Sequence, residues 1–157
     1  MIEFKEYNAA VASDKYAEIT NLLYTNGAKP KLDNAANAFA HLGVENDERV
    51  MAFVSVFKNQ AFADALVLGN YECVADDEIT KYLFLEIGKF AKGLNIQKLI
   101  GPMNGDTWHG YRFSVLDKAS FFLEANHKRY YLNQWQNAGF SALANYQTNR
   151  ELIQQNI

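Results

Sequence analysis

The segment "LIGPMNGDTWHGYRF", residues 99–113, holds the densest mixture of binding and reactive side chains in the chain. An apolar, strand-like run ends at Gly101 and Pro102, and no helical or strand period follows it. Aromatic rings, amides, hydroxyls and a guanidinium that can grip an anion through two parallel bonds are typical of a small-molecule pocket. We therefore expect a ligand-binding loop here, with contacts from Asn104, Thr107, Trp108, Tyr111 and Arg112.

A structural interpretation of the same segment stays open. Aromatic side chains in a long loop often pin that loop to the core, and Arg112 could simply pair with Glu124. His109 could act as a base near neutral pH. However, His41 and His127 are distant in sequence and no metal-ligand spacing is present, so we expect no metal site.

Other chemical signatures are missing from the sequence. No G-x-S-x-G, P-loop or G-x-G-x-x-G motif follows a strand-like run, so nothing supports a serine hydrolase, a kinase or a dehydrogenase. The single cysteine, Cys73, lies next to acidic residues, which raise a thiol pKa, so we expect no reactive thiolate.

The elements that must position these residues alternate between strand and helix patterns. Residues 2–4 alternate as in a strand, and residues 13–27 predict a helix that Ser13 or Asp14 could cap and Gly27 could end. Its expected apolar face consists of Tyr16, Ile19, Leu22 and Leu23. A second, weaker helix is predicted over residues 33–43, with an alanine-rich face.

Two β-rich runs follow, over residues 49–59 and 62–74, and the short polar tip between them predicts an antiparallel hairpin. The clearest helix pattern covers residues 76–95, with Asp76 or Asp77 as its cap. Residues 97–103 then predict a short buried strand that returns parallel to the hairpin.

The last elements are a helix within residues 128–140 and a strand over residues 141–149. Tyr131, Trp135 and Ala138 share one face of that helix, and Gly139 marks its end.

Composition sets the broad class. A chain of 157 residues with 49% hydrophobic residues fits one globular domain, residues 1–157, with a core of its own. The net charge of -3 and the lack of a basic run longer than Lys128-Arg129 argue against nucleic-acid binding. We expect no signal peptide and no membrane span. A lone cysteine excludes an internal disulfide and favours the cytoplasm.

The order of these elements, strand, two helices, hairpin, helix, strand, helix, strand, resembles the GNAT superfamily of acyl-CoA N-acyltransferases. Three pieces resemble one divergent GNAT-like branch: "GNYECVADDEITKYLFLEIGKFAKGLNIQKLIGPMNGDTWHGYRF", "FFLEANHKRYY", and "NAGF" followed by a strand with Tyr146. Together they cover about residues 66 to 148. The resemblance implies an α/β (α+β) fold, with a mixed, mostly antiparallel central sheet and helices on both faces.

The resemblance also implies acetyl-CoA or another acyl-CoA as cofactor, its pyrophosphate held by backbone amides at the start of the main helix. The residues that align there include Val74, Asp76 and Asp77. This loop has no glycine after Gly69 and no arginine, and its carboxylates would compete with phosphate for the same amides. The interpretation that Asp76 and Asp77 only cap the helix therefore stands beside cofactor binding.

Acyl transfer to an amine needs a base for the ammonium and an acid for the leaving thiolate. Many GNAT enzymes place the acid, a tyrosine, four residues before the glycine of "GF", where this chain has Trp135. Tyr131, one turn earlier on the same face, is the substitute candidate, and both rings could instead simply pack on the sheet. Glu72 and Glu124 are the candidate bases, and Glu124 is also a candidate substrate-binding residue; solvated or capping roles are the alternative.

Two functions follow from the resemblance. The first is acyl-CoA-dependent N-acyl transfer, such as acetyl transfer, to a small amine or amino-acid-like substrate. Its site would be a crevice where the strand ending at Pro102 parts from the hairpin, lined by the loop behind that strand, with Arg112 as anion anchor. The second is a non-catalytic GNAT-like ligand-binding or interaction module that has lost the pyrophosphate loop. GNAT domains usually end with two strands, whereas residues 150–157 are short, so an open sheet edge predicts a homodimer.

Overall fold

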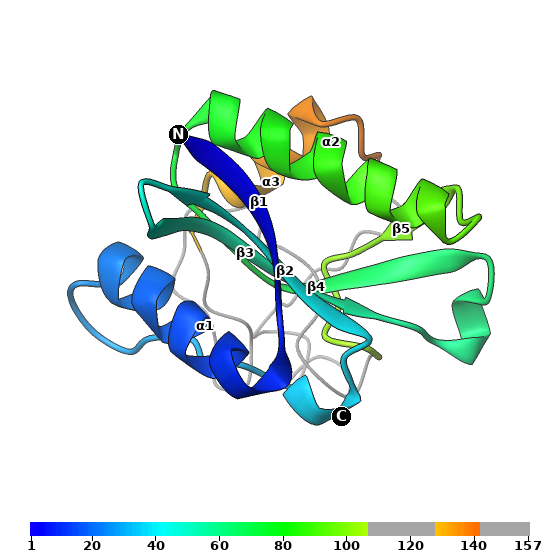
Figure 1. The fold of residues 1–157 in the computed structure, drawn as a ribbon, viewed down its shortest axis with the longest axis horizontal. Helices are drawn as coiled ribbons and strands as arrows, with labels where there is room; N and C mark the ends of the chain where they lie inside the picture. The colour runs from blue at the N-terminus through cyan, green and yellow to red at the C-terminus, as the bar shows by residue number, and fades with distance from the viewer. Residues whose placement is uncertain (107–127, 142–157) are drawn as a thin grey trace, which may run out of the picture.

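The computed structural model describes residues 1–106 and 128–141. Its strands are β1 (Ile2–Tyr7), β2 (Ala40–Asn46), β3 (Arg49–Phe57), β4 (Ala65–Cys73) and β5 (Lys98–Ile100). Its α-helices are α1 (Ala9–Leu23), α2 (Asp77–Gly93) and α3 (Tyr131–Asn137) (Figure 1). Two 3₁₀ turns, η1 (Ala35–Asn37) and η2 (Gln60–Phe62), lie before β2 and between β3 and β4.

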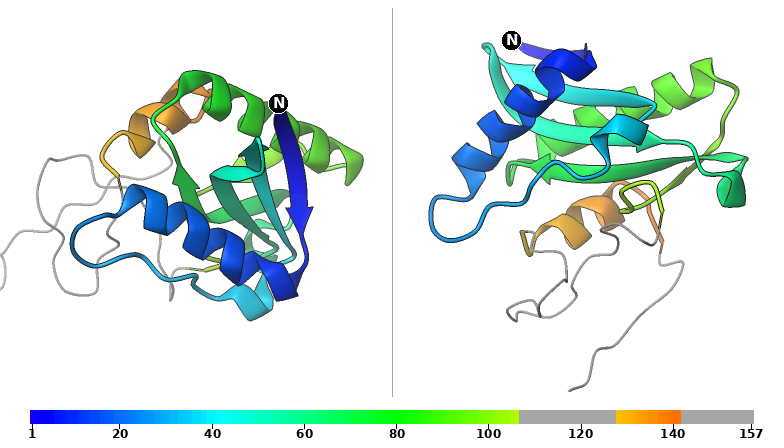
Figure 2. Two further views of the ribbon diagram at one scale, coloured as in Figure 1. Left: turned by 60° about the vertical axis from the view of Figure 1, so that its left-hand side comes forward. Right: turned by 90° about the horizontal axis from the view of Figure 1, so that it is seen from below.

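The described strands form one sheet in the order β1-β2-β3-β4-β5. Neighbours are antiparallel except β4 and β5, which run parallel because α2 carries the chain back between them. Helix α1 covers one face of the sheet, and α2 and α3 cover the other (Figure 2). The structure thus confirms the mixed, mostly antiparallel sheet with helices on both faces, the hairpin and the parallel crossover.

Helix α2 follows its sequence pattern. The Asp76 side chain caps it, as one of the two predicted caps, and a row spaced by four residues is buried against the sheet: Ile79, Leu83 and Ile87. The same core contains the side chains that β2 and β3 turn toward α2, including Leu42, Val44, Ala52, Val54 and Val56. This packing fixes the end of β4 and the start of α2, where the site lies.

The helix predicted over residues 33–43 is wrong. Only the turn Ala35–Asn37 is helical there, and the chain then enters β2, which pairs with β1 on one side and β3 on the other. Asn34 takes a left-handed conformation, with φ of 57°, which no α-helix continues. Pairing on both sides of β2 has outweighed the helix propensity of the alanines.

Helix α1 begins earlier than the sequence predicts. Asn8 is its cap, with Oδ1 accepting a hydrogen bond from the N–H of Val11, and Ser13 and Asp14 lie inside the helix. It ends at Leu23, before Gly27, and Leu22 is 52% exposed rather than part of the buried face. The error arises because a polar pair inside a helix resembles a cap in sequence.

Helix α3 and its Gly139 end are confirmed, since Gly139 has a φ of +106°. The strand predicted over residues 141–149 lies, beyond its first residue, outside the described residues. Within the described ranges, no helix has the length and apolar composition that crossing a bilayer requires.

Candidate functional site

The strongest concentration of buried polar groups surrounds Glu72 on β4, which is 3% exposed. The hydroxyl of Tyr131 on α3 donates to its Oε1 at 2.7 Å, and that of Tyr24, directly after α1, donates to the same oxygen at 2.8 Å. Tyr16 on α1 donates to Oε2 at 3.4 Å. We call these four residues the Glu72 cluster. The structure therefore brings together the two predicted catalytic residues, Glu72 and Tyr131, and adds two tyrosines that were not singled out for chemistry.

Burial dominates the electrostatics of the Glu72 cluster. It raises the pKa of Glu72 to about 7, although the three phenol hydrogen bonds and the positive charge of Lys128 work in the opposite direction. Burial also raises the phenol pKa values of Tyr131, Tyr16 and Tyr24, and the nearby Glu72 charge raises them further. At neutral pH, Glu72 is therefore partly protonated, while the phenols remain protonated.

The side chains of α3 and of Tyr130, directly before it, bond to the end of β4 and to Val74 after it, where β5 no longer pairs with β4. The Tyr131 hydroxyl accepts from the N–H of Cys73 at 3.1 Å, and the Tyr130 hydroxyl donates to the Cys73 carbonyl at 2.7 Å. Gln134 Nε2 donates to the Val74 carbonyl at 2.8 Å. Burial raises the pKa of the Cys73 thiol to about 11, consistent with the expected lack of a reactive thiolate.

The predicted parting of β4 and β5 is present. Backbone pairing between them covers three positions and ends at Val67 and Ile100, and a cis peptide at Gly101-Pro102 comes next. The Met103 N–H still donates to the Leu68 carbonyl at 2.8 Å. The crevice expected at this edge stays a prediction, because most of the loop that would line it lies outside the described residues.

Asn104, predicted to bind substrate, holds its own loop in place. Its Oδ1 accepts from the N–H of Asn70 at 2.7 Å, and its Nδ2 donates to Asp33 Oδ2 at 2.9 Å. Asn70 in turn exchanges two hydrogen bonds with the backbone of Asp33. Both side-chain atoms of Asn104 are therefore engaged in joining three segments of the chain.

The predicted cofactor residues lie at the start of α2. Asp76 Oδ1 accepts from the N–H groups of Glu78 at 2.9 Å and Ile79 at 3.3 Å, while the Val74 N–H donates to the Met51 carbonyl. The chain's own carboxylate thus takes amides that a phosphate would need, and Asp77 and Glu78 add negative charge in the first turn. This terminus does not fit the pyrophosphate of CoA.

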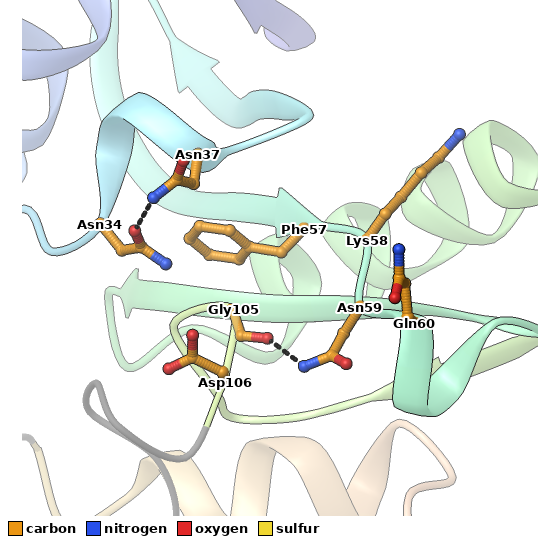
Figure 3. A pocket seen from close by; sticks show the side chains of 8 residues that line it. All are labelled: Asn34, Asn37, Phe57, Lys58, Asn59, Gln60, Gly105 and Asp106. Atoms are coloured by element: carbon orange, nitrogen blue, oxygen red, sulfur yellow. Dashed lines mark hydrogen bonds between the residues drawn. The ribbon is translucent and has the colours of Figure 1, made fainter.

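An open depression of about 320 Å³ is lined in part by Gly105 and Asp106, which follow Asn104 in the chain (Figure 3). Its lining is rich in amides, and two of them hold the loop: Asn34 Nδ2 donates to the Asn104 carbonyl, and Asn59 Nδ2 donates to the Gly105 carbonyl. The ring of Phe57 lies between these walls and is 1% exposed. Residues that line the depression therefore also hold the loop of residues 103–106 in place.

A buried histidine and serine form a further polar pair that the sequence did not indicate. His41 Nδ1 lies 2.8 Å from Ser55 Oγ, which also accepts from Asn70 Nδ2 at 3.0 Å. Burial lowers the pKa of His41, so its imidazole is neutral at neutral pH, and Ser55 is fully buried. No local motif links these residues, because their contact arises from the pairing of β2 with β3.

Five predicted substrate-binding residues lie outside the described residues: Thr107, Trp108, Tyr111, Arg112 and Glu124. In the part of the chain that the structure describes, no group of three or more histidine, cysteine or acidic side chains could hold a metal ion.

No protein-family model matches the sequence, and no curated protein matches it. Solved structures match over almost the whole chain. A predicted acetyltransferase from Clostridium acetobutylicum, crystallised with acetyl-CoA, matches with a TM-score of 0.54 and 12% identity over 98% of both chains. A ribosomal-protein-alanine N-acetyltransferase from Brucella melitensis matches with a TM-score of 0.57 and 12% identity, over 96% of this chain and 97% of that one.

An aminoglycoside acetyltransferase from an uncultured soil metagenomic sample also matches, with a TM-score of 0.56 and 8% identity. That match covers 95% of this chain and 97% of the other. At these identities the similarity establishes the fold alone.

Proposed function

We propose that this chain, which has the GNAT acetyltransferase fold, is an N-acyltransferase for a small amine, with Glu72 as its base. The observation that carries the proposal is the buried Glu72 carboxylate with its pKa raised to about 7. An alkylammonium must lose a proton before its nitrogen can attack an acyl group, and a base with a pKa near the working pH does this best. Solved structures of this fold include an aminoglycoside and a glucosamine-6-phosphate acetyltransferase, both of which act on small amines.

The geometry gives the two oxygens of Glu72 different roles. Tyr24 and Tyr131 hold Oε1 at 2.8 and 2.7 Å, whereas the bond from Tyr16 to Oε2 is long, at 3.4 Å. Oε2 is therefore the oxygen that accepts the proton of the amine. Tyr131 acts as a positioning residue, because its raised phenol pKa suits a hydrogen-bond donor better than a proton-donating acid.

The reaction needs a donor that carries an activated acyl group. The start of α2 offers no binding site for a phosphate group of such a donor. We assign Val74, Asp76 and Asp77 no contact with a nucleotide, since Asp76 already bonds the amides concerned. The donor class that fits the described residues is an acyl thioester whose recognition does not depend on a pyrophosphate. Acetyl-CoA and a phosphate-free acetyl thioester should then serve about equally well.

The test is acetyl transfer from S-acetyl-N-acetylcysteamine and from acetyl-CoA to a panel of primary amines. We expect transfer from both donors, with kcat/KM values within about tenfold of each other, and a loss of roughly 10²-fold or more in kcat for Glu72→Gln. A donor preference for acetyl-CoA far above tenfold would overturn the donor assignment. Full activity of Glu72→Gln would overturn the role of the base.

A second candidate function is a non-catalytic module that binds an amine. The acidic, self-capped start of α2 favours it, because the Asp76 carboxylate already bonds amides that the pyrophosphate of CoA would need. Calorimetry separates the two candidates. Binding of an amine without transfer from either thioester supports the module, whereas transfer with turnover supports the enzyme.

A further inference from the structure

Asparagine is followed by glycine at two places in the chain: Asn26-Gly27, shortly after α1, and Asn104-Gly105, after β5. In such a pair the backbone nitrogen of the glycine can attack the side-chain amide carbon of the asparagine, because glycine has no side chain to hinder the approach. Both glycines have a positive φ, 83° at Gly27 and 97° at Gly105. This backbone angle is therefore similar in the two pairs, and the difference between them lies in their surroundings.

The Asn104 side chain is held at both of its polar ends. Oδ1 accepts a hydrogen bond from the Asn70 N–H at 2.7 Å, and Nδ2 donates to Asp33 Oδ2 at 2.9 Å. The neighbouring Gly105 is buried, and a Cβ placed on it would meet Asn34 Nδ2 at 2.5 Å. Ring closure at this pair would move the amide away from both of its partners inside a packed loop, so the loop must open first.

The Asn26 side chain lies in the opposite kind of surroundings. It is exposed, and within the described residues it has no hydrogen-bond partner. Gly27 is exposed as well, and a Cβ placed on it would meet nothing within 4 Å. The amide of Asn26 is therefore free to turn toward the Gly27 nitrogen, and water reaches the pair.

From this contrast we propose that Asn26 is a site of spontaneous modification, where the chain acquires aspartate or isoaspartate, whereas Asn104 keeps its amide in the folded protein. A bond forms between the Gly27 nitrogen and Asn26 Cγ, and the bond between Cγ and Nδ2 breaks. Nδ2 leaves as ammonia and takes up the proton that the Gly27 nitrogen loses. Water from the solvent then opens the cyclic imide at either of its two carbonyls. Water is the co-reactant, and no group is oxidised or reduced.

The experiment incubates the folded full chain in mildly alkaline buffer and follows both pairs by peptide mapping with mass spectrometry. Asn26 should convert at least about tenfold faster than Asn104, because two hydrogen bonds hold the Asn104 amide. Each product replaces an amide by a carboxylate, so anion exchange should resolve a species with one negative charge more than the net charge of -3. Conversion of Asn104 as fast as that of Asn26 overturns the proposal.

Asn26→Gln is the matched variant for the exposed pair. Glutamine keeps the amide, but its longer side chain closes a ring on the next nitrogen far less readily. The acidic species should therefore be reduced at least about tenfold in this variant, and because the side chain is exposed we expect less than about 0.5 kcal/mol change in stability. An acidic species that forms equally fast in Asn26→Gln places the modification elsewhere and overturns the proposal.

Two further comparisons assign the protection of Asn104 to the fold. In concentrated urea, where the loop is open, the two pairs should convert at rates within about threefold of each other. Asp33→Ala removes the acceptor of Asn104 Nδ2, so in the absence of urea Asn104 should convert faster than in the unmodified chain, with the Asn26 rate unchanged. A tenfold difference that persists in urea, or an Asn104 rate that Asp33→Ala leaves unchanged, overturns the role of these hydrogen bonds.

Discussion

The phenol oxygen of Tyr131 lies 2.7 Å from Oε1 of Glu72 and accepts a hydrogen bond from the Cys73 N–H at 3.1 Å. One hydroxyl thus joins α3 to both the side chain and the backbone of β4, between residues 59 and 58 positions apart in sequence. Because that hydroxyl is buried, its bonds couple the proton affinity of Glu72 to the docking of α3.

Stability should fall as the pH rises through the range in which Glu72 ionises. Its pKa is raised from the ordinary 4.5 to about 7, so the folded chain binds a proton more tightly than the unfolded chain. The stabilisation is fully present below about pH 4.5, and about 3 kcal/mol of it is lost by about pH 7. Chemical unfolding of Glu72→Gln across this range should lack that decrease. The same slope in the variant would assign it to another group.

Removing single tyrosine hydroxyls should raise the pKa of Glu72 in a defined order. Tyr131→Phe and Tyr24→Phe each remove a bond of 2.8 Å or less, and Tyr16→Phe removes one of 3.4 Å, so the last should have the smallest effect. Tyr131→Phe should also destabilise the fold by about 1–3 kcal/mol, because it leaves the Cys73 N–H without its acceptor. NMR titration and denaturant unfolding provide the two readouts. A largest pKa change in Tyr16→Phe would contradict this geometry.

The cap of α2 should matter more than the acidic residue inside α1. Asp76→Ala removes a carboxylate that bonds two amides, and we expect a loss of about 1 kcal/mol and a Tm lower by roughly 2–4 °C. Asp14→Ala is the matched control, because Asp14 is exposed within α1, and its effect should stay below about 0.5 kcal/mol. Thermal unfolding of both variants at one pH compares them. Equal losses would mean that the Asp76 cap does not stabilise the helix.

Two glycines should respond oppositely to alanine. A Cβ at Gly69 would meet the Met103 carbonyl and Asn104 Oδ1, the latter at 2.5 Å, so Gly69→Ala should destabilise the chain by about 1–3 kcal/mol and displace the loop after β5. A Cβ at Gly88 in α2 meets nothing within 4 Å, so Gly88→Ala should stabilise the chain by up to about 1 kcal/mol. Denaturant unfolding tests both. Tolerance of alanine at position 69 would show that the loop does not pack closely on β4.

The sequence predicts the elements whose pattern is local. Helix α2, the hairpin and the parallel return were all predictable, because their caps, periodicity and turns lie within short windows. The prediction for residues 33–43 failed because the deciding interactions of β2 come from β1 and β3, which lie in other segments of the chain. Periodicity and capping signals depend only on residues that are close in sequence, so they cannot indicate this pairing.

The candidate site divides in the same way. Glu72 and Tyr131 could be selected through the resemblance to a fold, and Asp76 through its place before a helix. That Tyr16 and Tyr24 donate to Glu72 depends on the packing of α1 against β4, over separations of 56 and 48 residues. No local sequence pattern indicates that the hydroxyls of Tyr16 and Tyr24 have Glu72 as their partner.

Backbone pairing between β4 and β5 covers three positions and ends at Ile100. Past that residue, the described residues attach to β4 through the Met103 N–H, the side-chain amide of Asn104 and the side chains of α3. A strand ladder fixes the length of the chain that enters it, whereas a side-chain anchor can be rebuilt on a longer or shorter segment by a few substitutions. The described chain after β5 is therefore suited to grafting: a replacement that retains the Met103 backbone bond, Asn104 and the Tyr131 hydroxyl leaves the sheet unchanged.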